Sequence, residues 1–209
     1  MAPGITVGED GAARCFWCAG DEGYRTYHDG EWGFPSADDR HLFEKVCLEG
    51  FQAGLSWLTI LRKRAAFQRA FANFEMAKVA RFDARRVAKL LADPGIVRHR
   101  AKIESAIHNA RRALEVVEQE GSLAAFFWRF ERGPKERPRR MTRSAVVKLT
   151  ETPTSQALSK ELRRRGFSFV GPTTMYALMQ SVGLVNDHLE GCDARPRAEA
   201  ARRAFGRPR

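Results

Sequence analysis

Long hydrophobic runs are missing from this sequence. None of its apolar stretches approaches the roughly 20 residues that a helix needs to cross a bilayer. The opening segment, MAPGITVGEDGAARC, also lacks the basic region and apolar stretch of a secretory signal. We therefore expect no membrane association and a cytoplasmic location.

Alternating apolar and polar residues, the pattern of a half-buried strand, are also nearly absent. Only residues 146–149 could form a short strand, and they could equally be a loop. Apolar side chains instead recur at helical spacing, with Ser or Asp where helix N-termini are expected. These patterns predict an all-α protein with helices after residues 36–39, over 56–71, after 83, over 103–117, after 122, after 155 and over about 173–181.

Regular patterning is missing at both ends of the chain. Residues 1–13 are predicted to be a disordered lead, and the arginine-rich residues 193–209 a mobile basic tail. Residues 14–192 are predicted to form one helical domain of two packed lobes. Within it, residues 133–140 carry two prolines and are expected to be an irregular connection.

Acidic residues are in short supply. Against 25 Asp and Glu stand 36 Lys and Arg, which gives a formal charge of +11. Such a surplus favours a polyanionic partner, because neutralising phosphates releases condensed counterions. Many arginine-rich chains bind nothing anionic, so the charge alone does not establish a nucleic acid as the partner.

Cysteines are few, and a reducing cytosol disfavours disulfides between them. His188 and Cys192 are four residues apart and share one face of a helical turn. Together with Cys15 and His28 they make an ordinary tetrahedral zinc set. Two alternatives stay open: these residues could simply be buried, and Cys15 with Cys18 is itself a ligand pair. A closed four-ligand site would be structural and would tie the chain ends together.

A carboxylate among aromatic residues forms a second constellation. Glu49 lies in the segment VCLEGFQAGLSW, where a lone carboxylate must be exposed, paired or held in a site. An aromatic pocket with one hydrogen-bond acceptor suits a flipped, positively charged base. Such a base stacks on the aromatic rings and is held by cation–π attraction. In the alternative interpretation, Glu49 is exposed and the tryptophans fill the core. The neighbouring aromatic residues are Trp17, Tyr24, Tyr27, Trp32 and Trp57.

A glycine-bearing turn, Gly166 to Thr174, follows three arginines and precedes an apolar helix. Backbone N–H groups at such a helix start can face a phosphate. An ordinary connection between helices is the alternative. The arginines, and the lack of a preceding strand, favour the DNA backbone over a nucleotide cofactor.

Taken together, these motifs resemble those of the bacterial 3-methyladenine DNA glycosylase I family. The segments that carry the resemblance span nearly the whole region from Cys15 to Cys192: CFW at 15–17, YHDGEWG at 27–33, LEGFQAGLSW at 48–57, GIVRHR at 95–100, GFSFVG at 166–171 and VNDH at 185–188. The sequence departs from the family pattern at Phe51, where glutamine is expected, at the additional Cys18, and in its longer basic tail. Because of Phe51, the resemblance does not define the detailed shape of the pocket.

The resemblance implies a fold and a set of sites. The fold is the helix–hairpin–helix DNA glycosylase fold, with one structural Zn²⁺ per chain joining the N- and C-terminal segments. Glu49 and Tyr27 are implied as catalytic residues. The remaining implied residues are the base-binding Trp57, Tyr24, Trp17 and Trp32, the DNA-binding Phe169, Val170, Gly171 and Thr173, and the zinc ligands Cys15, His28, His188 and Cys192.

The resemblance also implies an activity: hydrolysis of the N-glycosidic bond of 3-methyladenine in alkylated double-stranded DNA, releasing the base and leaving an abasic site. Asn186 stands where related glycosylases carry an aspartate, and no lysine lies between Pro172 and Gly183 to form a Schiff base. We therefore expect a monofunctional hydrolase. We also expect it to be monomeric and to use no nucleotide cofactor. The alternative is a catalytically silent, zinc-stapled DNA-binding module, which needs no buried Glu49.

Overall fold

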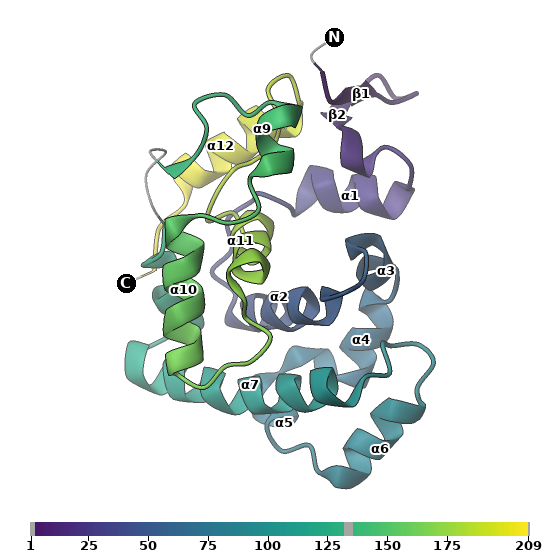
Figure 1. Cartoon of the computed structure of the whole chain (residues 1–209), viewed down its shortest axis with the longest axis vertical. Helices are drawn as coiled ribbons and strands as arrows, with labels where there is room; N and C mark the ends of the chain where they lie inside the picture. Colours follow the sequence, from purple (N-terminus) through teal and green to yellow (C-terminus); the bar gives the residue numbers. More distant parts are fainter. Residues whose placement is uncertain (1–2, 132–135, 209) are drawn as a thin grey trace.

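The computed structural model describes residues 3–131 and 136–208, so part of the predicted connection at 133–140 lies outside it. Helices dominate these residues, as Figure 1 shows. They are α1 (Glu22–Gly30), α2 (Asp39–Gln52), α3 (Trp57–Arg62), α4 (Arg64–Ala70), α5 (Met76–Val79), α6 (Ala84–Ala92), α7 (Arg100–Glu120), α8 (Leu123–Trp128), α9 (Arg143–Lys148), α10 (Pro153–Arg164), α11 (Pro172–Ser181) and α12 (Ala194–Ala204), with the 3₁₀ turns η1 (Phe16–Cys18) and η2 (Ala72–Phe74).

Side-chain caps begin most of the predicted helices where the sequence places them. Asp38, Asp83 and Ser122 accept hydrogen bonds from the first-turn N–H groups of α2, α6 and α8. Ser56 caps α3, but the single helix predicted over 56–71 is divided at Lys63 into α3 and α4. The helix predicted after residue 155 begins earlier, because Thr152 is its cap and Ser155 completes a reciprocal capping box.

The predictions for the chain ends are wrong. The supposed disordered lead contains β1 (Ile5–Val7), which pairs antiparallel with β2 (Ala13–Cys15). The supposed mobile tail forms α12, whose Ala194 and Ala198 are buried one turn apart against the rest of the protein. The candidate strand at 146–149 belongs mostly to α9.

The core is built around α2, which is buried from Leu42 to Phe51 and packs against α7, α8 and α11. One large cluster of buried apolar side chains contains residues from Leu42 to Val185. A second, small cluster at the chain ends contains Cys15, Leu189, Cys192 and Ala194. Within the described ranges, no helix combines the length and apolar character that a membrane span requires.

The turn between α10 and α11 is fastened to α7. The Asn109 side chain accepts from the Ser168 N–H at 3.0 Å and donates to the Ser168 carbonyl oxygen at 2.9 Å. Ser105 Oγ lies 2.7 Å from Ser168 Oγ. This clamp holds Phe169, which has a φ of 56° and is 37% exposed. The turn is therefore a fixed element rather than a loose connection.

Candidate active site

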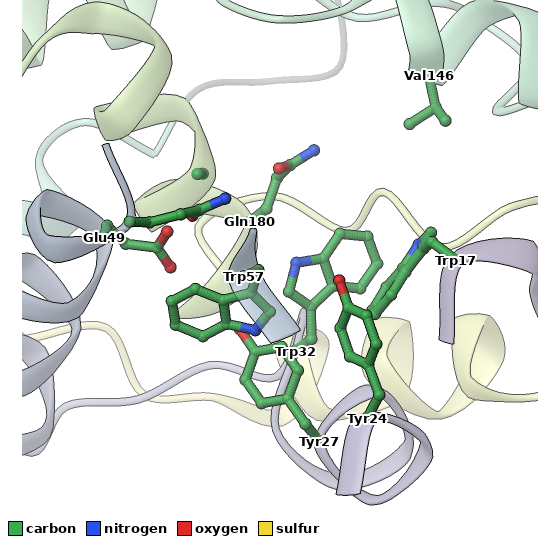
Figure 2. Close-up of a pocket in the computed structure, with 10 residues that line it drawn as sticks. Trp17, Tyr24, Tyr27, Trp32, Glu49, Trp57, Val146 and Gln180 are labelled. Carbon is green, nitrogen blue, oxygen red and sulfur yellow. The ribbon is translucent and has the colours of Figure 1, made fainter. Parts of the chain in front are cut away.

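A pocket of about 230 Å³ opens between the N-terminal segment, α2, α3 and α11. Figure 2 shows the aromatic side chains gathered in it, with Glu49 to the left of the rings and Val146 above them on α9. All six residues predicted for the base pocket line this one cavity. Its lining residues are Trp17, Tyr24, Tyr27, Trp32, Glu49, Gln52, Trp57, Val146, Ala177 and Gln180.

Short helices place the aromatic residues. Asp21 caps α1, which presents Tyr24 and Tyr27 on neighbouring turns. Trp17 stands in η1, and its ring lies 4.9 Å from those of both Tyr24 and Trp32, measured between centroids. These rings support one another at tilted and edge-on angles, which are favourable for aromatic pairs.

Trp57 is the first residue of α3, and its ring centroid lies 5.4 Å from that of Tyr27. Its indole Nε1 is buried, and no acceptor among the described residues reaches it. Buried donors usually have partners, so this one is an exception among the described residues.

Glu49 is buried rather than exposed, with 4% of its surface accessible. Burial raises the pKa of its carboxyl group, while the neighbouring Lys45 ammonium opposes that rise. Lys45 Nζ lies 3.4 Å from Glu49 Oε1 and donates to the Tyr27 hydroxyl at 3.0 Å. The sequence analysis did not single out Lys45, although its spacing of four residues from Glu49 on an apolar helix could have drawn attention to it.

A chain of charges extends behind Lys45. Glu31 Oε1 lies 4.0 Å from Lys45 Nζ, and the other oxygen of Glu31 accepts from Arg64 at 2.5 Å. Arg64 also donates to the buried Glu44 at 2.9 Å. Three carboxylates therefore alternate with two cations in this network. When all five groups are ionised, the network has one negative charge in excess.

The four predicted metal ligands come together. Cys15, His28, His188 and Cys192 are all buried, and their ligand atoms lie within 4.8 Å of one another. This set could hold a metal ion. The additional Cys18 lies outside it and donates its thiol hydrogen to the Cys15 carbonyl oxygen at 3.1 Å.

The outer contacts of the two histidines fix which ring nitrogens face inward. His28 Nδ1 lies 2.7 Å from Asp29 Oδ1, and His188 Nε2 lies 2.9 Å from the Trp32 carbonyl oxygen. Both partners are acceptors, so these outer nitrogens carry the protons when the rings are neutral. The inner nitrogens, 3.1 Å apart, then present lone pairs to each other, an arrangement that a cation between them relieves.

The cluster of predicted metal ligands also contacts the pocket, because Trp32 lines the cavity and touches His188. Its carbonyl group accepts from His188 while its ring lines the cavity. Gly33, the next residue, has a φ of 84°, and a Cβ there would come within 3.1 Å of the His188 ring. Glycine is therefore strongly favoured where the chain passes this predicted ligand.

The predicted DNA-contacting residues differ in exposure. Phe169 and Thr173 are exposed, Gly171 is half-buried at the N-cap of α11, and Val170 is buried in the core. Val170 therefore contributes no side-chain surface, although its backbone stays in the turn.

Asn186 and Asp187 have structural partners. The Asn186 amide donates to the Arg195 carbonyl oxygen at 3.0 Å. Asp187 accepts from the Tyr176 hydroxyl at 2.5 Å and from Arg137 at 2.6 Å. Neither side chain is among the residues that line the pocket.

Comparisons with known proteins agree with the motifs. Residues 17–196 match the family described as methyladenine glycosylase. The chain is 45% identical over 183 residues to DNA-3-methyladenine glycosylase 1 of Escherichia coli (strain K12), covering 88% of this chain and 97% of that protein. A crystal structure of 3-methyladenine DNA glycosylase I is 46% identical with a TM-score of 0.80, over 88% of this chain and all of that one. A single-residue variant of 3-methyladenine DNA glycosylase I in complex with 3-methyladenine is 36% identical with a TM-score of 0.78, over 85% of this chain and 94% of that one.

Proposed function

The chain belongs to the methyladenine glycosylase family, and from that premise we propose that it excises 3-methyladenine from alkylated DNA in base-excision repair. The observation that carries the proposal is the buried Glu49 at the inner side of an aromatic pocket. A protein that only binds DNA has no need to bury a carboxylate there. Bases lie inside the duplex stack, so the damaged nucleotide must first be turned out into the pocket.

The pocket offers complementary contacts to such a base. The aromatic faces of Trp57 and Tyr27 supply stacking, and Glu49 supplies an acceptor for the exocyclic amino group. Tyr24, Trp17 and Trp32 complete the aromatic lining. These roles make Glu49 and Tyr27 the catalytic contacts and the other four the base-binding residues.

Hydrolysis of this glycosidic bond needs little catalytic assistance from the protein. Methylation at N3 leaves the base positively charged while it is attached to the sugar, so the glycosidic bond is weak and the base departs neutral. Aromatic faces and a negative excess favour that cation over normal adenine. The base takes the bonding electron pair, and water then adds to the sugar cation and loses a proton to the solvent. No lysine occurs in α11, so we propose a monofunctional hydrolase that leaves an abasic site.

We also propose that the cluster of Cys15, His28, His188 and Cys192 holds one structural Zn²⁺. Two thiolates and two imidazoles are an ordinary zinc set, and all four positions are used by the protein. A bound zinc cross-links the N-terminal segment to residues 188–192. The contact between His188 and the Trp32 carbonyl oxygen then helps to hold the Trp32 ring in the pocket lining.

For the DNA contact we propose that α10, the turn and α11 form a helix–hairpin–helix. Support comes from the clamped turn, the N–H groups at the start of α11 and the formal charge of +11. Phe169, Gly171 and Thr173, with the backbone of Val170, would face the sugar–phosphate chain of double-stranded DNA.

The direct test is release of free 3-methyladenine from methylated duplex DNA by the purified protein. We expect base release with intact DNA strands until the abasic sites are cleaved chemically. Tight DNA binding without any base release would instead support the silent DNA-binding module.

A further inference from the structure

Lys45 is a lysine enclosed in the protein beside the pocket. Its side chain has no exposed surface, and it lies on α2 one turn before Glu49. Its ammonium group lies 3.4 Å from Glu49 Oε1, 3.0 Å from the Tyr27 hydroxyl and 4.0 Å from the centre of the Trp57 ring. One buried cation thus contacts three base-handling side chains, although it is not itself among the residues that line the cavity.

We propose that Lys45 is a positioning residue that keeps Glu49 in its carboxylate form and directs the Tyr27 hydroxyl hydrogen toward the base. This inference rests on the proposed function, since it assigns a role within the same pocket. It goes further by naming what makes the two catalytic contacts usable.

The first part of the argument concerns the charge of Glu49. Burial alone can raise the pKa of a carboxyl group by up to about 3–5 units, which is enough to protonate it at neutral pH. Burial does raise the pKa of Glu49, and Lys45 opposes the rise by its charge and by a hydrogen bond. Burial lowers the pKa of Lys45, while Glu49 and Glu31 favour its charged form. Each charge of the pair therefore favours the charged form of the other against the effect of burial.

The remaining groups around Glu49 do not replace Lys45. Glu31, at the end of α1, raises the pKa of Glu49 by its negative charge. Ser181 on α11 lowers the pKa of Glu49, but its hydroxyl hydrogen is donated to the Leu178 carbonyl oxygen at 2.9 Å. Tyr24 and Tyr27 on α1 are neutral phenols whose own pKa values are raised by burial. Farther out, Arg64 on α4 is occupied by Glu31 and Glu44, and His41 lies against the same two carboxylates.

The second part concerns the direction of a hydrogen bond. An ammonium group can only donate, so the Tyr27 oxygen must accept from Lys45. The hydroxyl hydrogen of Tyr27 is then free for another acceptor. An adenine base offers ring nitrogens as acceptors and an amino group as donor. Lys45 thereby gives the pocket one donor, Tyr27, beside one acceptor, Glu49.

The test replaces Lys45 by methionine, which keeps a similar length without the charge. Excision of 3-methyladenine is measured under single-turnover conditions from acid to alkaline pH, with the enzyme-free rate subtracted. Because the rate requires ionised Glu49, it falls as pH falls through the pKa of that group. We expect Lys45→Met to move this acid limb about 1–3 pH units toward alkaline pH, with activity returning at high pH. An unmoved limb in a folded variant overturns the proposal.

Two controls separate this effect from a general loss. Lys78→Met removes an exposed lysine that pairs with Glu75 on the surface, and it should leave the limb in place. In a Glu49→Gln background, Lys45→Met should shift nothing further, because the titrating group is gone. A shift that persists in the double variant would also overturn the proposal.

A direct titration makes the result independent of excision. The carboxyl carbon resonance of Glu49 in ¹³C-glutamate-labelled protein is identified by its loss in Glu49→Gln. We expect a carboxylate at neutral pH in the wild type and a protonated acid in Lys45→Met. A protonated Glu49 in the wild type at neutral pH refutes the role of Lys45 even if the variant does not fold. Absent base release, with the expected titration, would refute the proposed function alone.

The Tyr27 contact is tested by a double-mutant cycle on affinity for free 3-methyladenine, followed by tryptophan fluorescence. If Lys45 acts through the Tyr27 hydroxyl, Tyr27→Phe and Lys45→Met should each weaken binding, and their effects should be less than additive. Strict additivity would remove Tyr27 from the proposal.

Discussion

At the scale of single residues, the proposed mechanism gives Glu49 the charge that separates the lesion from normal adenine. Both bases present the same amino donor, so a hydrogen bond to it discriminates poorly. Positive charge is what the attached lesion has and normal adenine lacks. A carboxylate in a pocket of low dielectric favours that cation more strongly than it would in water.

Glu49→Gln keeps the shape and one acceptor but removes the charge. We expect the variant to lose selectivity for 3-methyladenine over adenine and to excise about 100-fold more slowly, the scale of losing one electrostatic contact in an active site. Single-turnover excision measures this, with circular dichroism and metal content as controls. A folded variant that excises at the wild-type rate would remove Glu49 from the mechanism.

In the proposed site, Trp57 contributes to binding of the base rather than to recognition of its charge. Trp57→Ala removes a stacking face, and we expect base capture to weaken by about 1–3 kcal/mol. The measurement is the affinity for free 3-methyladenine together with the substrate dependence of excision. Trp128→Ala is the matched control, because Trp128 packs against Phe205 away from the pocket. Equal losses in both variants would indicate damage to the fold instead.

The sequence predicted residues of the pocket that are chemically conspicuous and failed where the pattern was ambiguous. Glu49 stood out because a lone carboxylate among apolar groups must be exposed, paired or held in a site, and the family resemblance assigned it and the aromatic residues to one pocket. Lys45 did not, since a lysine on a helix is ordinarily solvated and only tertiary packing encloses it. Gln180, Ala177 and Val146 come from distant elements and have no local signal.

At the scale of elements, the caps made helix starts predictable, because a single side chain satisfies the free N–H groups. The ends of the chain were misjudged for a physical reason. Strands of three residues are too short for an alternating pattern, and β1 is stabilised by pairing with β2. In α12 the buried face consists of the small side chains Ala194 and Ala198, so arginine dominated the composition.

The turn before α11 permits a clean test of the DNA contact. Gly171 has a φ of −61°, and a Cβ there would meet only the flexible end of Arg163 at 3.6 Å and Thr174 at 4.0 Å. The structure therefore has room for a Cβ at this position, and we expect Gly171→Val to fold, whereas a close DNA backbone would leave it no space. We expect weaker binding to all sequences alike, measured on duplex DNA with an abasic site. Full affinity would show that the proposed hairpin contact is misplaced.

At the scale of the whole molecule, the metal-ligand cluster joins segments more than 150 residues apart in sequence, as the His28–His188 separation of 160 shows. Cys192→Ser removes one ligand, and we expect it to abolish zinc binding and lower Tm by about 10 °C, the shift for a few kcal/mol in a domain of this size. Zinc content and thermal unfolding are measured together. Cys18→Ser is the matched control and should keep its zinc, because Cys18 lies outside the ligand set. Loss of zinc in Cys18→Ser would require a different set of ligands.

The same cluster also affects the order in which parts of the protein fold. Helices α2, α7, α10 and α11 can pack through the core before the chain ends meet. Trp17 and Trp32, by contrast, belong to the stretch that carries Cys15 and His28, and their final place depends on His188 and Cys192. Contacts of such long sequence separation form slowly, because loop closure precedes any gain from them. In refolding from denaturant, helical structure should therefore return before the capacity to bind 3-methyladenine, and added zinc should shorten only the second delay.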